Sequence, residues 1–241
     1  MLIVPDIHGR SFWKETVARH FSAQPDDAPE EERKVVFLGD YLDPYPRERI
    51  SMFKAMDVLR DVIELKRMHP DDVVLLLGNH DMSYIMPGRF RCSRHDYFYE
   101  QDANKLFWDN IDMFSFVHTC CIRDKRYIFS HAGITPGWSI SGLAIKNMDD
   151  VISICSQGLS SQELIDALRF VSLKRGGRNV YGSMIWADLS EFDDYSPHSA
   201  NDYQVFGHTQ QSDTPIVTQH YACLDCRKVF QLHDNEFIPI I

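Results

Sequence analysis

The sequence predicts an α/β protein, and three observations support this fold class. Short, continuous apolar runs recur along the chain and are bounded by polar turn residues, as in strands that are covered on both faces. Patterns with helical spacing lie between these runs, and such alternation is typical of α/β folds. The chain has 241 residues and is 44% apolar, which suffices for one sizeable domain with a covered core. We therefore expect a single domain over residues 1–241.

The expected strands follow one another along the chain. They are Leu2–Val4, Lys34–Leu38, Val73–Leu77, Arg126–Ser130 and Tyr203–Gly207. Ile50–Met68 places apolar residues close to helical spacing, and Ser160 with Glu163 matches a capping box that opens a further helix. Residues 82–116 are rich in aromatic residues, Arg and Met, and we interpret them as a helical insertion. From Pro215 onward, strand-like patterns predict a closing antiparallel meander.

Composition narrows the class of partner. The formal net charge is −10, whereas proteins that bind a long phosphate backbone usually carry a basic face, so a nucleic-acid partner is not expected. A small phosphorylated substrate remains compatible with this charge, because a metal reverses the local sign. No apolar stretch is long enough for a membrane helix, and the first residues do not match a signal peptide. These features predict a cytoplasmic protein without a membrane partner.

The cysteines do not form a convincing framework. The spacing of Cys223 and Cys226 is compatible with half of a zinc site or with a redox pair. The sequence contains no second pair of this kind to complete a zinc site. The flanking residues are strand-like and do not begin a helix that would lower a thiol pKa. Buried, reduced thiols are the favoured interpretation.

Polar, ligand-type side chains follow each expected strand. The motifs are Asp6-Ile7-His8-Gly9, Gly39-Asp40-Tyr41-Leu42-Asp43, Gly78-Asn79-His80-Asp81, His131-Ala132-Gly133 and Gly207-His208-Thr209. In open α/β sheets, ligands bind beyond the carboxyl ends of the strands. Singly, each fragment is an ordinary turn or helix cap, but five in succession make coincidence a poor explanation. Such carboxylates and imidazoles would repel one another and lose hydration unless divalent metals bound them.

The order of these motifs resembles that of the calcineurin-like metallophosphoesterase superfamily, over most of the chain from Asp6 to His208. The stretches SHAGITPGW and MIWADLSEF most resemble its phosphoprotein phosphatase branch, which includes bacterial serine/threonine phosphatases and symmetrical dinucleoside tetraphosphatases. The resemblance implies a four-layer α/β/β/α sandwich with two mixed β-sheets.

The resemblance also implies a site for two divalent metal ions. One ion would be held by Asp6, His8 and Asp40, and the other by Asn79, His131 and His208, with Asp40 bridging both. Imidazole and carboxylate donors without thiolate suit manganese, which we favour, as well as iron, zinc or cobalt. A metal-bridging hydroxide would attack phosphorus in line. His80 would protonate the leaving group as a general acid, and Asp43 would hold its ring and raise its pKa.

Two positions depart from the family patterns. The phosphoprotein phosphatase branch has Arg directly after the Asp43 position, where it grips the substrate phosphate, but this chain has Pro44. Arg47 and Arg49 are the nearest replacements in the sequence. Further candidates are Arg10, Arg175 and Arg178. Many superfamily members carry a last metal-binding His where this chain has Gln210, and the phosphoprotein phosphatase branch lacks that His, which favours this branch.

These features predict a metal-dependent phosphoesterase that hydrolyses phosphomonoesters, with a small phosphorylated molecule or a phosphoprotein as its substrate. One alternative is a symmetrical dinucleoside polyphosphate hydrolase, because GNHD and HAGITP resemble that subgroup. An alternative of another class is a catalytically silent scaffold that keeps the metals for structure. The pair of Asp43 and His80 argues against the scaffold, since neither residue is needed merely to hold metals.

Overall fold

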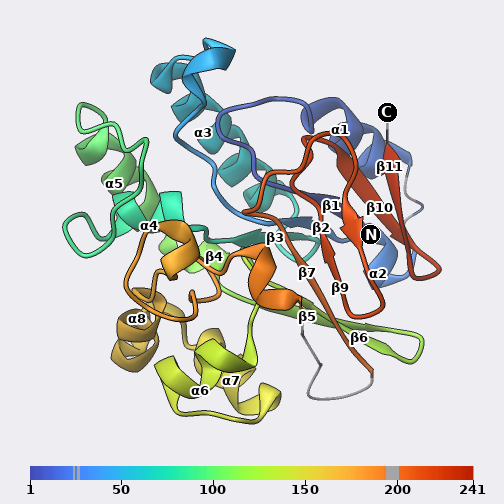
Figure 1. Ribbon diagram of the computed structural model, residues 1–241. Helices are drawn as coiled ribbons and strands as arrows, with labels where there is room; N and C mark the ends of the chain where they lie inside the picture. Colours follow the sequence, from blue (N-terminus) through green and yellow to red (C-terminus); the bar gives the residue numbers. More distant parts are fainter. Residues whose placement is uncertain (24, 26–27, 194–200, 241) are drawn as a thin grey trace. The chain divides into compact units, whose positions relative to one another are not determined.

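A computed structural model describes residues 1–23, 25, 28–193 and 201–240 of the chain (Figure 1). The chain divides into two compact units, one formed by Met1–Phe114 with Arg227–Ile241 and the other by Ser115–Cys226. Each unit is described by itself below. The single domain over residues 1–241 that the sequence favours stays a prediction.

The first unit is organised by a six-stranded mixed sheet with the order β11-β10-β1-β2-β3-β4. The strands are β1 (Leu2–Val4), β2 (Val35–Phe37), β3 (Val73–Leu76), β4 (Phe114–Ser115), β10 (Val229–His233) and β11 (Glu236–Ile240). β1, β2 and β3 run parallel, with Val36 paired to Ile3 on one side and to Val74 on the other. Their carboxyl ends therefore meet at one edge of the sheet, where the first three motifs follow.

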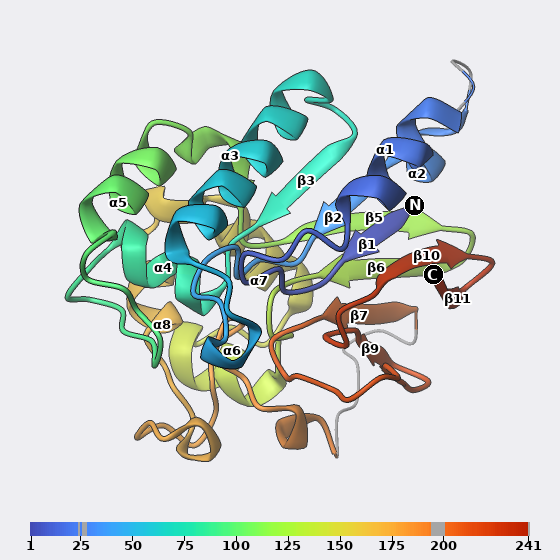
Figure 2. The same cartoon turned by 90° about the horizontal axis from the view of Figure 1, so that it is seen from above.

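Helices and short helical turns connect these strands. They are α1 (Lys14–Ala23), α2 (Glu30–Arg33), η1 (Pro46–Glu48), α3 (Met52–Met68), α4 (Asn79–Ile85), α5 (Glu100–Trp108) and η2 (Ile111–Met113). The Ser51 side chain caps α3 by accepting from the backbone N–H of Lys54, and α3 runs alongside β3 (Figure 2). Within the region expected to be a helical insertion, residues 82–116, the structure has the end of α4, all of α5 and η2. Its status as an insertion stays a prediction.

The second unit has a five-stranded mixed sheet with the order β5-β6-β7-β9-β8. The strands are β5 (His118–Ile122), β6 (Lys125–Phe129), β7 (Asp202–Phe206), β8 (Ile216–Val217) and β9 (Tyr221–Cys223). β6, β7 and β9 are parallel, and antiparallel β5 and β8 lie at the edges. The helical elements are α6 (Pro136–Leu143), α7 (Met148–Ser156), η3 (Gly158–Ser160), α8 (Gln162–Leu168), η4 (Leu173–Arg175) and η5 (Leu189–Phe192). The expected two mixed β-sheets are thus confirmed.

Two local expectations need correction. The residue that caps α8 is Ser161, whose hydroxyl accepts from the Leu164 N–H, while Ser160 ends the preceding η3 turn. The strands after Pro215 do not form one meander, because β8 and β9 join the second sheet, whereas β10 and β11 join the first. β9 also pairs parallel with β7. Alternating sequence patterns identify strands, but pairing depends on contacts with distant parts of the chain.

The structure also bears on the expectations about the cysteines and about membrane-spanning helices. Cys223 and Cys226 are buried, and within the described residues neither belongs to a disulfide, in line with the favoured interpretation of buried, reduced thiols. In the part of the chain that the structure describes, no helix is long and apolar enough to cross a membrane.

Candidate metal and catalytic site

Left-handed backbone conformations concentrate at the predicted site residues. His8 has φ 46°, Asp40 φ 55°, Asp43 φ 60° and His208 φ 62°. Non-glycine residues seldom adopt this region, and each such conformation is maintained only when surrounding structure compensates its strain, which is common at functional sites. The turns lie in the segments that follow the buried strands β1, β2 and β7, so their side chains lie beyond the strand ends.

Glycines permit close approaches in the turns that contain His8 and His131. Gly9 has φ 75°, and a Cβ atom there would lie 2.7 Å from the Ala55 Cβ on α3. Gly133 has φ 85°, and a Cβ atom there would lie 2.4 Å from the Phe192 ring. Both contacts would be too short for a side chain, so glycine lets the chain turn against its neighbours directly after His8 and two residues after His131.

Asp6, His8 and Asp40 form a buried cluster in the first unit. Each offers one ligand-type atom, and these atoms all lie within 4.8 Å of one another. The His8 Nδ1 donates to the Leu42 carbonyl at 2.8 Å, which fixes the tautomer and leaves the Nε2 lone pair 3.6 Å from Asp40 Oδ2. A backbone carbonyl on the second ring nitrogen is a common arrangement for a histidine that binds a metal.

The electrostatics of this cluster suit a divalent cation. Burial raises the pKa of Asp40 to about 7, the nearby Asp81 adds to that rise, and His80 opposes it. Burial also holds the pKa of His8 well below its ordinary value, with His80 and Arg94 acting in the same direction. The imidazole of His8 is therefore neutral at neutral pH and has a lone pair to give. A cation would remove the cost of ionising Asp40, so the donors fit the expected metal.

Asp81 holds two of the motifs together. Its carboxylate accepts from the backbone N–H groups of Gly78 and Asp40 at 2.8 Å and of Tyr41 at 3.0 Å. In return, the Asp40 carboxylate accepts from the His80 N–H at 2.9 Å. The structure shows capping of the α4 N-terminus that extends to the Asp40 turn.

Asp43 and His80 form a buried pair beside the cluster. The His80 Nδ1 lies 2.6 Å from Asp43 Oδ2, so Nε2 is left as the outward nitrogen. The Tyr84 hydroxyl donates to Asp43 Oδ1, and the Cys92 thiol donates to Oδ2 at 3.1 Å. Burial and the Asp43 charge raise the pKa of both donors, so they stay protonated. Burial alone would lower the pKa of His80, but Asp40 and the hydrogen bond to Asp43 raise it above its ordinary value.

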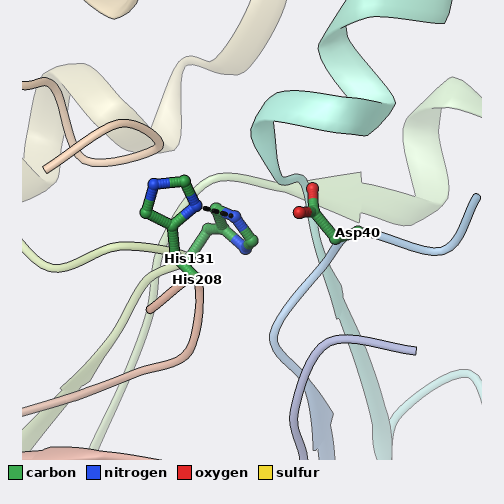
Figure 3. Close-up of side chains that lie close together, drawn as sticks. All are labelled: Asp40, His131 and His208. Carbon is green, nitrogen blue, oxygen red and sulfur yellow. Dashed lines mark hydrogen bonds between the residues drawn. The ribbon is translucent and has the colours of Figure 1, made fainter. Parts of the chain in front are cut away.

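Asn79, His131 and His208 are the remaining predicted ligands. Asn79 is the first residue of α4 in the first unit and is 2% exposed. In the second unit, His131 follows β6 and His208 follows β7, and their ring nitrogens lie 3.1 Å apart, His131 Nε2 to His208 Nδ1 (Figure 3). The Gly207 N–H donates to the His131 carbonyl at 2.8 Å, which ties the two strand ends together. Asp40, which is also drawn in Figure 3, follows β2.

The arginines expected from the sequence have varied surroundings. Arg10 makes a two-point ion pair with Glu48, at 2.7 and 2.9 Å. Arg175 pairs with Asp188 at 2.9 Å in the second unit. The other three candidates are exposed on the surface: Arg47, Arg49 and Arg178. The sequence did not single out Arg94, whose guanidinium lies beside His8 and His80, because residues 86–99 have no clear periodicity and no strand end to mark them.

Comparison with protein families decides the classification. The family model described as "calcineurin-like phosphoesterase" matches residues 1–212. The chain belongs to this family.

Individual relatives are distant. The chain is 23% identical over 217 residues to the serine/threonine-protein phosphatase PP2A-like PPG1 of Saccharomyces cerevisiae, which supports the phosphoprotein phosphatase-like branch. The match covers 85% of this chain and 49% of that protein, so the chain spans about half the length of this curated relative. Two solved structures of a cold-active protein tyrosine phosphatase, one of them of a mutant, have TM-scores of 0.58 and 0.56 with 18% identity. The two alignments cover 99% of this chain and 75% and 76% of the chains in those structures. This similarity shows that the proteins share a fold, which for this chain is the calcineurin-like phosphoesterase fold.

Proposed function

We propose that this protein is a divalent-metal-dependent phosphatase that hydrolyses phosphomonoesters. The observation that carries the proposal is the joint presence, in the first unit, of the Asp6, His8 and Asp40 cluster and the pair of Asp43 and His80. The first is a donor set for a cation. The second is a carboxylate-held imidazole, which is suited to general acid catalysis. Membership of the calcineurin-like phosphoesterase family and the similarity to a serine/threonine-protein phosphatase support the same chemistry.

We propose two metal ions, following the family resemblance. The first would be bound by Asp6, His8 and Asp40 and the second by Asn79, His131 and His208, with Asp40 shared. When bound, such ions supply a nucleophilic water near neutral pH and neutralise charge on the phosphoryl oxygens. Manganese as the native metal and a cytoplasmic location remain predictions.

The residues of the chain would then carry the proton transfer. The Asp43 carboxylate accepts from His80 Nδ1 at 2.6 Å, so the protonated imidazole can deliver a proton only from Nε2. The donors Tyr84 and Cys92 hold the Asp43 carboxylate in place from its other sides. Asp40 and the hydrogen bond to Asp43 raise the pKa of His80 above its ordinary value, which favours the acid form of the imidazole that would protonate the leaving-group oxygen.

The experiment is a substrate panel on the manganese-loaded protein. It compares aryl phosphates, phosphopeptides, sugar phosphates and nucleotides with diesters, single-stranded nucleic acid and diadenosine tetraphosphate. We expect kcat/KM for at least one monoester to exceed that for diesters and nucleic acid by about tenfold or more, because a net charge of −10 opposes the binding of a long phosphate backbone. A higher value for diadenosine tetraphosphate than for every monoester would replace the proposal by the dinucleoside polyphosphate hydrolase. No turnover of any substrate with metals bound would favour the scaffold.

A further inference from the structure

Arg94 has a guanidinium that two contacts hold in place. Its Nε donates to the Asp43 carbonyl at 3.0 Å, and its Cζ lies 3.8 Å from the centre of the Tyr45 ring. The first contact fixes the position of the group along the loop, and the second is a close cation–π arrangement. The side chain comes from the segment between α4 and α5, about fifty residues after the Asp43 turn.

The rest of the guanidinium faces the two imidazoles. Its Nη2 lies 3.3 Å from both ring nitrogens of His8 and 3.5 Å from Nε2 of His80. The His8 Nδ1 already donates to Leu42, so Nη2 packs against that ring instead of donating to this nitrogen. Among residues 1–23, 25, 28–193 and 201–240, no carboxylate forms a salt bridge with Arg94. The half-buried cation therefore has N–H donors directed at the site and no anion to receive them.

Arg10, by contrast, cannot act in this way. Its Nε and Nη2 donate to the Glu48 carboxylate, and its Nη1 donates to the Asp6 and Ile7 carbonyls. Arg47 lies 5.3 Å from the Tyr45 ring centre and is exposed. Arg94 thus differs from both in combining a fixed position with donors left for an anion.

The anchor of Arg94 lies directly beside Pro44 in the sequence. The carbonyl that accepts from Arg94 Nε belongs to Asp43, the residue directly before Pro44. A guanidinium from a distant loop is therefore brought to the point of the chain where the phosphoprotein phosphatase branch has its Arg. Pro44 has no donor of its own, whereas the planar fork of Arg94 matches two phosphoryl oxygens.

We infer that Arg94 binds the phosphoryl group of the substrate and replaces the Arg that is absent at Pro44. The inference rests on the proposed phosphatase function for its substrate, but its core is an anion site beside His8 and His80. The ligand class is a terminal phosphoryl group or free inorganic phosphate, which present several oxygens to a guanidinium. Arg94 would contact the substrate directly, so it would act in binding as well as in the stabilisation of charge during the reaction.

The test is titration of the metal-loaded protein with inorganic phosphate by calorimetry, together with steady-state kinetics on an aryl phosphate. The variants are Arg94→Ala, Arg94→Lys and, as the matched control, Arg91→Ala, an exposed arginine three residues earlier. We expect Arg94→Ala to weaken phosphate binding at least about tenfold, or about 1.4 kcal/mol, and to raise KM. Arg91→Ala should leave both unchanged.

Arg94→Lys separates binding from loop support. A lysine ammonium can still donate to the Asp43 carbonyl, but it lacks the planar fork for two phosphoryl oxygens. We expect Arg94→Lys to keep the metal content and the unfolding midpoint while phosphate affinity falls several-fold. The inference would be overturned if a metal-loaded Arg94→Lys or Arg94→Ala protein bound phosphate as tightly as the unmodified protein does. So would loss of phosphate binding on Arg47→Ala with Arg49→Ala but not on Arg94→Ala.

Failure of the inference and failure of the proposed function give different results. If the unmodified protein binds phosphate through Arg94 but hydrolyses no ester in the panel, the phosphatase proposal fails and the anion site stands. If it hydrolyses monoesters with phosphate affinity independent of Arg94, the function stands and the assignment of Arg94 is overturned.

Discussion

Asp81→Asn is expected to destabilise the protein strongly although it preserves size and shape. The carboxylate has no exposed surface and accepts three backbone N–H groups, those of Gly78, Asp40 and Tyr41. An amide keeps one oxygen, which can serve Gly78 and Asp40 as Oδ2 does now. Its NH₂ group would then face the N–H of Tyr41, and this buried donor would lose its acceptor.

The expected cost follows from those bonds. One orphaned buried donor costs about 1–3 kcal/mol, and the two remaining bonds lose their charged acceptor at about 1 kcal/mol each. Relief of the repulsion between Asp81 and Asp40, which now raises the pKa of Asp40, offsets part of this. We expect a net loss of about 2–4 kcal/mol in the free energy of unfolding.

Urea unfolding of the chelated protein, followed by circular dichroism, measures this loss by linear extrapolation. The matched control is Asp57→Asn on the exposed face of α3, where the carboxylate pairs with Arg60 at the surface and should contribute less than about 1 kcal/mol. The reasoning would be refuted if Asp81→Asn unfolded within about 0.5 kcal/mol of the unmodified protein, because the amide would then satisfy all three donors.

Four further outcomes test the proposed chemistry. Chelation should abolish turnover and Mn²⁺ should restore it, with Asp40→Asn the most damaging ligand change; full activity after exhaustive demetallation would exclude the metal mechanism. His80→Asn should lower kcat by roughly 10²–10⁴ with metals retained, and less for aryl phosphates with acidic phenols, so an equal loss across leaving groups would count against the acid role. Activity should fall as pH rises through the raised pKa of His80. Asp43→Asn should move that fall to lower pH, because it removes an interaction that favours the imidazolium, and an unchanged pH profile would contradict this. Gln210→Ala should leave two metals per chain and kcat little changed, as elemental analysis and kinetics can check, whereas loss of one metal would make the amide a ligand.

The sequence located the strands that carry the motifs, β1, β2, β3, β6 and β7, because each is a short apolar run with a polar end, a local signal. It did not mark β4 or β5, which lack such a run. It also marked the residues at those ends, since His8, Asp40 and Asp43 lie beside glycines or in tight turns that follow a strand. Their left-handed backbones, by contrast, follow from the packing of the turns and have no signature beyond the neighbouring Gly. The division of the last strands between two sheets was not predictable, because it depends on pairing across most of the chain.

Asp81 and Arg94 differ in how far sequence could reach them. Asp81 stands three residues after Gly78 at the start of a helix, which is the position of a capping acid, so half of its role was visible. Its hydrogen bonds to the backbone of Asp40 and Tyr41 span about forty residues of sequence, and no local pattern could predict them. The guanidinium of Arg94 contacts residues far away in the sequence, among them Asp43, His8 and Tyr45, and it comes from a loop without clear periodicity. Nothing in the local sequence distinguishes Arg94 from Arg91.

The pairing of β1 with β10 has a consequence for the order in which the chain can fold. β1 is made first, but its antiparallel neighbour β10 begins at Val229, after the whole second unit has been synthesised. Until then, one side of β1 has unpaired backbone groups, and an open strand edge of this kind can associate with other chains. Residues 115–226 contain all five strands of their own sheet, so that sheet can form while the first is still incomplete. A nascent chain of this protein therefore has a late, vulnerable interval that closes only when residues 229–240 emerge from the ribosome.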